Sequence, residues 1–197
     1  MGRKKTGLDE KLLSAADELF YAKGYTNTGI SELVARAGTN KPGLYSYFQS
    51  KDEIARRYLS RRNQAMNDRI VAFGKESRSV VDFFRRWMAD ARDHARGAFG
   101  QYNGCAVANF ALQTEIGQEE MQSFIRETGR RWQSQLVAYL RSEIRAGKFP
   151  AQPGAAVTAR RMLLCNEGAI LMWKITGNLQ YFDDAVQMFE AALKSEE

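Results

Sequence analysis

Proline is scarce in this chain of 197 residues, and so are the patterns that mark a β-strand. The three prolines stand at positions 42, 150 and 153, and no segment alternates strictly between apolar and polar residues. Apolar residues instead recur every three to four positions, in stretches that glycines separate. The sequence therefore predicts an all-α fold.

Cysteine and histidine are also scarce, which excludes several kinds of chemistry. The two cysteines, Cys105 and Cys165, are too few for a disulfide framework and lack the spacing of a zinc site. His94 is the only histidine, and no HExxH motif, phosphate-binding glycine loop or cluster of metal ligands is present in the sequence. We therefore expect no metal, no cofactor and no enzymatic activity.

Long apolar runs are missing too. No stretch approaches the roughly 18 to 20 uncharged residues of a membrane helix, and the basic start Met1-Gly2-Arg3-Lys4-Lys5 is not followed by an apolar signal region. Apolar residues make up 44% of the chain and charged residues 26%, a balance that favours a globular protein over a disordered one. We expect a cytoplasmic protein with no membrane partner.

Lysine and arginine are concentrated in the first third of the chain, and most of the net charge of +6 therefore lies there. Residues 1–62 contain 12 Lys and Arg against 7 Asp and Glu, a net of +5, whereas residues 63–197 contain 17 against 16, a net of +1. A basic head on a nearly neutral body suits a polyanion, because cationic side chains that neutralise phosphates release condensed counterions. A solvated charged surface is the alternative explanation.

The first third also contains two short helical segments with a turn between them. The predicted helices of this part cover residues 8–23, 29–37 and 41–48. Thr28 and Asn40 can cap the second and third, and Pro42 falls in a first turn, where a missing N–H costs little. Because about three residues that include Gly38 separate the last two helices, the pattern predicts a helix-turn-helix.

The remaining sequence reads as a larger helical body. Its predicted helices cover residues 51–73, 79–97, 103–114, 118–146, 154–176 and 181–194. We expect a helix-turn-helix domain over residues 1–50 and a larger helical domain over residues 51–197; the family resemblance described below implies that the first binds DNA and that the second senses a ligand and dimerises.

The second helix of a helix-turn-helix lies in the major groove and reads base edges with its N-terminal residues. Leu44 and Phe48 repeat at helical spacing and should pack inward. The candidate DNA contacts stand on the outward side of that helix or at helix N-termini, where free N–H groups favour an anion. They are Thr28, Lys41, Pro42, Gly43, Tyr45, Ser46, Tyr47 and Lys51.

The run LLSAADELFYAKGYTNTGISELVARAGTNKPGLYSYFQSKDEI resembles the DNA-binding head of the TetR family of bacterial repressors, and the similarity covers residues 8–54. Its most specific parts are AADELFYAKGYTNT, the ARAG turn, GLYSYF and SKDEI. The resemblance implies a three-helix head on a larger helical body, a homodimer on an inverted-repeat operator, and release from DNA when a small molecule enters the body. It places Thr28, Tyr47 and Lys51 on phosphates and Lys41, Gly43, Tyr45 and Ser46 at the groove.

Two further features of the head affect how it would contact DNA. Family members commonly have Gly-Thr, Gly-Ala or Gly-Ser where this chain has Pro42-Gly43, so residue 43 has only its backbone to offer DNA. The basic arm Arg3, Lys4 and Lys5 resembles arms that enter a neighbouring minor groove, and a solvated tail is the alternative.

Two C-terminal helices carry broad apolar faces. The apolar residues are Val157, Met162, Leu163, Ile170 and Trp173 on one helix and Phe182, Ala185, Val186, Phe189 and Leu193 on the other. We interpret both faces as a dimer interface in which each subunit gives two helices to a four-helix bundle, with packing inside one subunit as the alternative.

Candidate effector contacts are aromatic residues of the central helices and one thiol. They are Trp87, Tyr102, Phe110, Trp132 and Cys105. The segment YNGCAVANFALQ puts Cys105 at a helix start, where a thiol is more reactive, and resembles a GC-V-N-A segment of family members that respond to electrophiles or quinone-like compounds. Tight packing at a helix entry is the alternative, and Cys165 reads as a core residue.

Two other functions remain open at this point. A non-specific architectural DNA-binding protein would share the basic head but would not distinguish one duplex from another. A cysteine-dependent enzyme would need a base beside a thiol, and the coincidence of His94 and Cys105 in one region is weak evidence for it.

Overall fold

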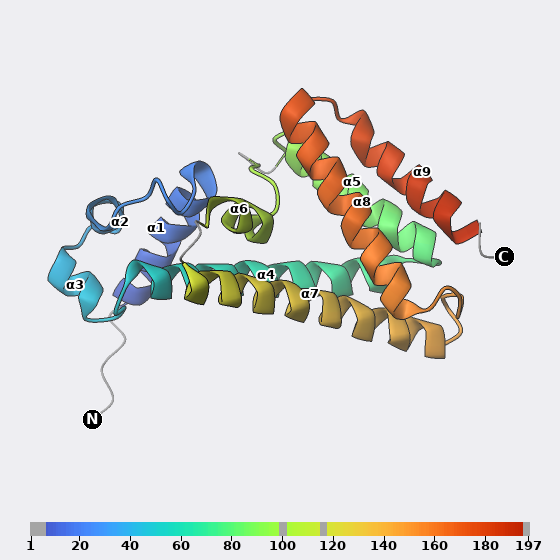
Figure 1. Cartoon of the computed structure of the whole chain (residues 1–197), viewed down its shortest axis with the longest axis horizontal. Coiled ribbons are helices and arrows are strands. Elements are labelled where there is room, and N and C mark those ends of the chain that lie inside the picture. Colours follow the sequence, from blue (N-terminus) through green and yellow to red (C-terminus); the bar gives the residue numbers. More distant parts are fainter. Residues whose placement is uncertain (1–6, 99–101, 115–117, 195–197) are drawn as a thin grey trace. The chain divides into compact units, whose positions relative to one another are not determined.

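The computed structural model describes residues 7–98, 102–114 and 118–194, so the basic arm Arg3, Lys4 and Lys5 lies outside the described residues. Throughout these ranges the regular structure is α-helical, which confirms the all-α prediction (Figure 1). The helices are α1 (Leu8–Lys23), α2 (Ile30–Arg36), α3 (Lys41–Tyr45), α4 (Lys51–Glu76), α5 (Val80–Ala95), α6 (Ala106–Gln113), α7 (Glu119–Arg145), α8 (Ala155–Thr176) and α9 (Gln180–Lys194). No helix of the described residues is long and apolar enough to cross a membrane.

All predicted helix boundaries lie within three residues of the observed ones, and the largest differences are at the end of α3, the end of α4 and the start of α6. The helix expected over residues 41–48 ends at Tyr45, because the chain tightens into a turn in which the N–H of Tyr47 donates to the carbonyl of Leu44 at 2.9 Å. The helix expected over residues 51–73 continues to Glu76. There the hydroxyl of Ser77 donates to the carbonyl of Phe73 at 2.6 Å.

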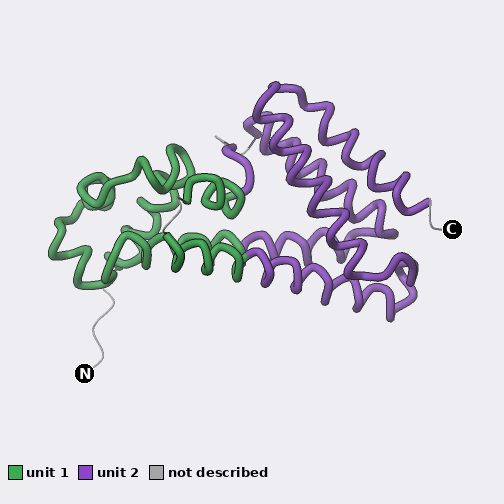
Figure 2. Tube along the Cα trace, in the orientation of Figure 1, with its two compact units in different colours: residues 1–63, 106–128 green, residues 64–105, 129–197 purple. Residues whose placement is uncertain are grey.

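Packing divides the chain into two compact units (Figure 2). Unit 1 is Met1–Asn63 with Ala106–Thr128, and unit 2 is Gln64–Cys105 with Gly129–Glu197. This division differs from the boundary at residue 50, because the first turns of α4 and all of α6 share one core with α1. The functional division into residues 1–50 and 51–197 stays a prediction.

An aromatic cluster closes the core of unit 1. The ring of Phe110, on α6, lies 5.8 Å from that of Phe20, 5.4 Å from that of Tyr25 and 5.5 Å from that of Tyr58. Such ring pairs contribute about 0.5 to 1.5 kcal/mol each beyond their area burial. Phe110 is 2% exposed, so α6 is held in the core of the N-terminal helices.

The core of unit 2 lies among α5, α7, α8 and α9. The rings of Phe84 on α5 and Phe189 on α9 are 4.7 Å apart. A guanidinium nitrogen of Arg92 reaches both carboxylate oxygens of Asp183, at 2.7 and 2.8 Å, and joins the same two helices. Apolar contact and a charge-assisted hydrogen bond therefore fix α5 against α9.

The apolar faces expected at a dimer interface lie largely inside unit 2. Met162, Ile170, Phe182, Ala185 and Phe189 are buried in its core, and Leu163, Trp173, Val186 and Leu193 pack against it. For these residues the alternative of packing within one subunit describes the structure. A different set of large apolar side chains is exposed on α8 and α9, namely Leu164, Leu171, Ile175 and Met188.

Truncating Phe110 tests whether α6 belongs to the core of unit 1. We expect Phe110→Ala to lower the free energy of unfolding by about 3 to 5 kcal/mol, because it opens a cavity among three aromatic rings. Leu112→Ala, on the same helix, is the matched control because Leu112 is 78% exposed, and it should change the free energy little. Urea unfolding measures both, and equal losses in the two variants would contradict the packing.

Candidate nucleic-acid interface

A tight turn separates α2 from α3. Gly38 has a φ of +65°, a left-handed conformation that favours glycine, and the N–H of the next residue, Thr39, donates back to the carbonyl of Val34 at 2.9 Å. The chain therefore leaves α2 in one fixed direction. This geometry confirms the expected helix-turn-helix, with the glycine where the sequence placed it.

The start of α3 is capped from within. The side-chain oxygen of Asn40 accepts a hydrogen bond from the N–H of Gly43 at 2.8 Å. A Cβ at Gly43 would lie 2.5 Å from the Thr39 hydroxyl and 3.1 Å from the same Asn40 oxygen, so the cap is built around a glycine. This explains the glycine of the unusual Pro42-Gly43 pair. A side chain at position 43 would collide with the cap, and the Gly43 N–H already donates to Asn40.

One face of α3 is anchored and the other is exposed. Leu44 is fully buried in the core of unit 1, and Phe48 in the following turn is 3% exposed. Lys41 and Pro42 are exposed at the first turn, and Tyr45 is 53% exposed. The five-residue helix is thus fixed by its inner face while the first turn and Tyr45 face outward.

Ser46 and Tyr47 lie in the turn after α3 and are half-buried. The Ser46 hydroxyl donates to the carbonyl of Gly43 at 2.7 Å, which closes the last turn of the helix. Tyr47 packs against the core of unit 1. Of the predicted groove and phosphate contacts, these two are less accessible than Lys41 and Tyr45.

Thr28 and Lys51 are engaged inside unit 1. Thr28 is 1% exposed, and its hydroxyl donates to the carbonyl of Gly24 at 2.7 Å. The Lys51 ammonium donates to the carbonyls of Tyr25 at 2.9 Å and Thr28 at 3.0 Å, and lies 4.1 Å from the centre of the Tyr25 ring. Burial lowers the pKa of Lys51. Both side chains hold the loop between α1 and α2.

The predicted effector residues fall in three places. Tyr102 and Cys105 lie in the segment that precedes α6, Trp87 and Trp132 lie in the core of unit 2 with ring centres 6.3 Å apart, and Phe110 lies in the core of unit 1. Trp87 and Trp132 are therefore in ring contact, and Cys105 packs against the same core of unit 2.

The segment from Tyr102 to Cys105 lies along α8. The ring centre of Tyr102 is 5.5 Å from that of Trp173 and 5.6 Å from that of His94 on α5. The Lys174 ammonium donates to the carbonyl of Asn103 at 3.2 Å. Gly104, at φ +80°, lies so close to α8 that a Cβ there would be 2.9 Å from Ile170.

Two polar residues of α8 at this segment were missed by the sequence analysis. The Cys105 thiol hydrogen-bonds to the Glu167 carboxylate, and the Asn166 amide donates to the same carboxylate at 3.1 Å. Burial raises the pKa of Glu167. An Asn-Glu pair inside the apolar stretch Met162–Trp173 was the available signal, since polar residues on a buried helix need partners.

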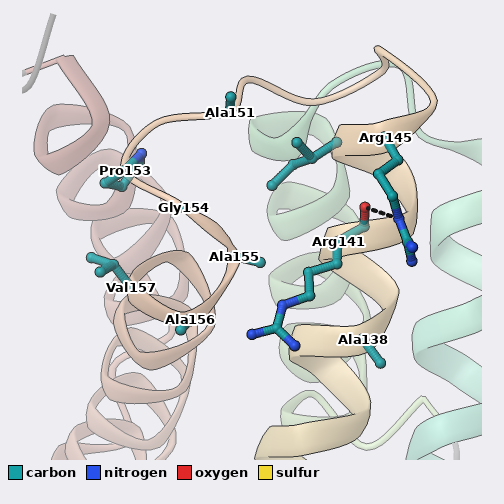
Figure 3. A pocket seen from close by; sticks show the side chains of 10 residues that line it. Ala138, Arg141, Arg145, Ala151, Pro153, Gly154, Ala155, Ala156 and Val157 are labelled. Carbon is teal, nitrogen blue, oxygen red and sulfur yellow. Dashed lines mark hydrogen bonds between the residues drawn. The ribbon is translucent and has the colours of Figure 1, made fainter.

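A groove of about 660 Å³ lies elsewhere in unit 2, between the end of α7 and the start of α8 (Figure 3). Arg141 extends into the space between the two helices, and the Arg145 Nε donates to the carbonyl of Arg141 at 3.3 Å. None of the predicted effector residues lines this groove. Among the described residues there is also no group of three or more side chains able to hold a metal ion.

Comparison with known proteins agrees with this architecture. Residues 12–58 match the model of the bacterial regulatory proteins of the tetR family, and residues 78–189 match that of a tetracyclin repressor-like C-terminal domain. A relative from Lactococcus lactis, an uncharacterised HTH-type transcriptional regulator, is 24% identical over 194 residues, which cover 94% of this chain and 92% of the relative.

Solved structures show the same fold. A TetR-family transcriptional regulator from Cytophaga hutchinsonii has a TM-score of 0.82 at 18% identity, with 99% of this chain and 97% of that chain covered. The transcriptional regulator FadR from Bacillus subtilis, in complex with stearoyl-CoA, has a TM-score of 0.68 at 16% identity, with 91% and 96% covered.

Two lysines of unit 1 provide a test of the local geometry. We expect Lys51→Met to lower the free energy of unfolding by about 1 to 3 kcal/mol, because the carbonyls of Tyr25 and Thr28 lose a charged donor. Lys41→Met, at an exposed position, should leave that free energy within about 0.5 kcal/mol of the parent value. Chemical denaturation distinguishes them, and a stable Lys51→Met variant would show that the ammonium does not hold the loop.

Proposed function

The chain belongs to the TetR family of bacterial regulatory proteins, and we propose that it is a repressor that binds an inverted-repeat operator as a homodimer and leaves DNA when a small-molecule or thiol-reactive effector reaches unit 2. The observation that carries this proposal is the anchored α3, whose outer face presents Lys41 and Tyr45 to solvent.

Recognition of DNA is assigned to the exposed face of α3. The major groove accepts an α-helix, and a lysine at its start can donate to guanine or to a phosphate, while a tyrosine can contact either. Lys41, Pro42 and Tyr45 are therefore the primary contacts, with Ser46 and Tyr47 at the edge. Thr28, Gly43 and Lys51 act indirectly, because their donor groups already bind the protein's own acceptors.

Dimerisation is assigned to the exposed apolar residues of α8 and α9. Leu164, Leu171 and Ile175 are spaced by seven and four residues and so share one face of α8, at 74%, 49% and 67% exposure. Met188 adds a 67% exposed side chain on α9. To read adjacent half-sites, the two copies of α3 in such a dimer need a spacing of about 34 to 36 Å.

Effector response is assigned to the segment that enters α6. The stearoyl-CoA in the FadR structure supports a small-molecule ligand for this chain, and we assign it to residues 78–189, which match the tetracyclin repressor-like domain. The chain passes from unit 2 to unit 1 between Cys105 and Ala106, and the rest of α6 is bound in the core by Phe110. A ligand that displaces residues 102–105 would therefore pull on α6.

The energy needed for release is modest. A ligand shifts the equilibrium only by the difference between its affinities for the DNA-binding and the released states. Each tenfold loss of operator affinity requires about 1.4 kcal/mol of that difference.

Selection of bound sequences from random duplex DNA tests the operator claim. We expect an inverted repeat, and we expect Tyr45→Ala and Lys41→Ala to weaken binding to it by about 1 to 3 kcal/mol for a base contact. The slope of log affinity against log salt should fall by about one for Lys41→Ala if that lysine contacts a phosphate. Lys75→Ala, an exposed lysine of unit 2, is the control.

Equal affinity for the selected and a scrambled duplex would instead identify a non-specific DNA-binding protein.

Substitution of each cysteine in turn distinguishes a sensing thiol from a structural one. Cys105→Ser should abolish release from DNA by iodoacetamide, because it removes the nucleophile that directly precedes α6. Cys165→Ser should keep the response, since burial raises the pKa of the Cys165 thiol and so disfavours its reactive form. Band-shift assays measure both, and full release from Cys105→Ser would make Cys105 a packing residue.

A further inference from the structure

The side chains of Asn166 and Glu167 on α8 contain more hydrogen-bond acceptors than the described part of the protein satisfies with donors. Asn166 is 1% exposed, and its amide nitrogen donates to Glu167, but its Oδ1 is buried without a hydrogen-bond partner in the described part of the chain. The groups that stabilise the ionised form of Glu167 are the Cys105 thiol and this amide, and both are neutral.

Such an arrangement is unusual inside a protein. Most buried polar atoms have a partner, and a buried acceptor that lacks one loses the hydrogen bonds it made with water. Glu167 is half-buried, and partial removal of a carboxylate from water without a cation beside it is also costly, which agrees with its raised pKa. Replacement by apolar side chains would remove this cost, so the pair calls for a function.

We propose that Asn166 and Glu167 form the polar end of the effector site and bind an organic cation that carries N–H groups, such as an amidinium, guanidinium or ammonium group. This inference rests on the proposed function, because it names the chemical class of the effector. The cation supplies the missing donor to the Asn166 Oδ1 and the missing charge beside the Glu167 carboxylate.

The alternatives to a cation fit less well. An anion would be repelled by Glu167, and a neutral amide would satisfy the Asn166 Oδ1 but leave the carboxylate without charge compensation. An amidinium offers two parallel N–H groups, the geometry that carboxylates bind most strongly.

The position of the pair also connects binding to release. Glu167 hydrogen-bonds to the thiol of Cys105, the last residue before α6. A cation on the carboxylate competes with that thiol for the same oxygens, so its arrival removes one of the contacts that hold the segment on α8. Binding of the cation therefore favours displacement of residues 102–105.

The test compares benzamidinium with benzamide, which has a similar shape and no charge. In full-length protein that carries Cys165→Ser, calorimetry gives the affinity of each probe, and the rate of Cys105 alkylation by iodoacetamide gives a local readout of the site. We expect benzamidinium to bind at least about tenfold more tightly and to change the alkylation rate. Glu167→Gln should remove this preference, and Glu190→Gln, on α9, should keep it.

Equal binding of the two probes, no binding of either, or a preference that survives Glu167→Gln would overturn the proposal. Asn166→Leu provides an independent check if Glu167→Gln does not fold. Because it removes the unpartnered acceptor, it should weaken benzamidinium binding by about tenfold or more. Unchanged affinity in a folded Asn166→Leu variant would make Asn166 structural and would also overturn the proposal.

The two proposals can fail separately. Probe binding is measured without DNA, and operator preference is measured on the wild-type protein without a probe. If the protein selects an operator but does not distinguish benzamidinium from benzamide, only the cation site is wrong. If it distinguishes the probes but prefers no duplex, the regulatory function is wrong and the binding site stands.

Discussion

Burial of Leu44 is the constraint on which the rest of the structure depends. An isolated helix needs about 12 to 15 residues to be even marginally stable in water, and α3 has five. It exists because Leu44 is fully buried, Phe48 follows it into the core, and Asn40 caps its first turn. The same anchoring fixes the direction of the opposite face, so the exposure of Lys41 and Tyr45 is a consequence of core packing.

The core that holds Leu44 also holds α6. Beyond the aromatic cluster around Phe110, the Thr26 hydroxyl donates to the carbonyl of Gln113 at 3.2 Å, in the loop that leads to α2. The start of α6 directly follows the segment that lies along α8. One short helix therefore belongs structurally to the DNA-binding unit and covalently to the segment assigned to the effector.

Local rules of sequence account for much of this fold. Apolar spacing, Gly38 and the capping residue Asn40 predicted the helices and the turn, because these signals act over a few residues. Long-range packing was not predictable in the same way. Phe110 and Trp132 are both apolar residues of central helices, and only the tertiary structure assigns the first to unit 1 and the second to unit 2. The same limit applied to α8. This helix has one apolar face buried in the core of unit 2 and another exposed, and the sequence pattern alone does not distinguish the two. Thr28 and Lys51 were predicted to bind phosphate because they stand at helix N-termini. Their actual partners are backbone carbonyls, which no side-chain pattern reports.

The central claim is that the outer face of α3 reads DNA, and a photo-crosslinker at residue 45 examines it most directly. With p-benzoylphenylalanine in place of Tyr45 and a duplex that contains the selected inverted repeat, the account predicts crosslinks to bases in the major groove of each half-site. The same group at Val71, an exposed residue of unit 2, should give none. Crosslinking from position 71 but not from position 45 would contradict the account.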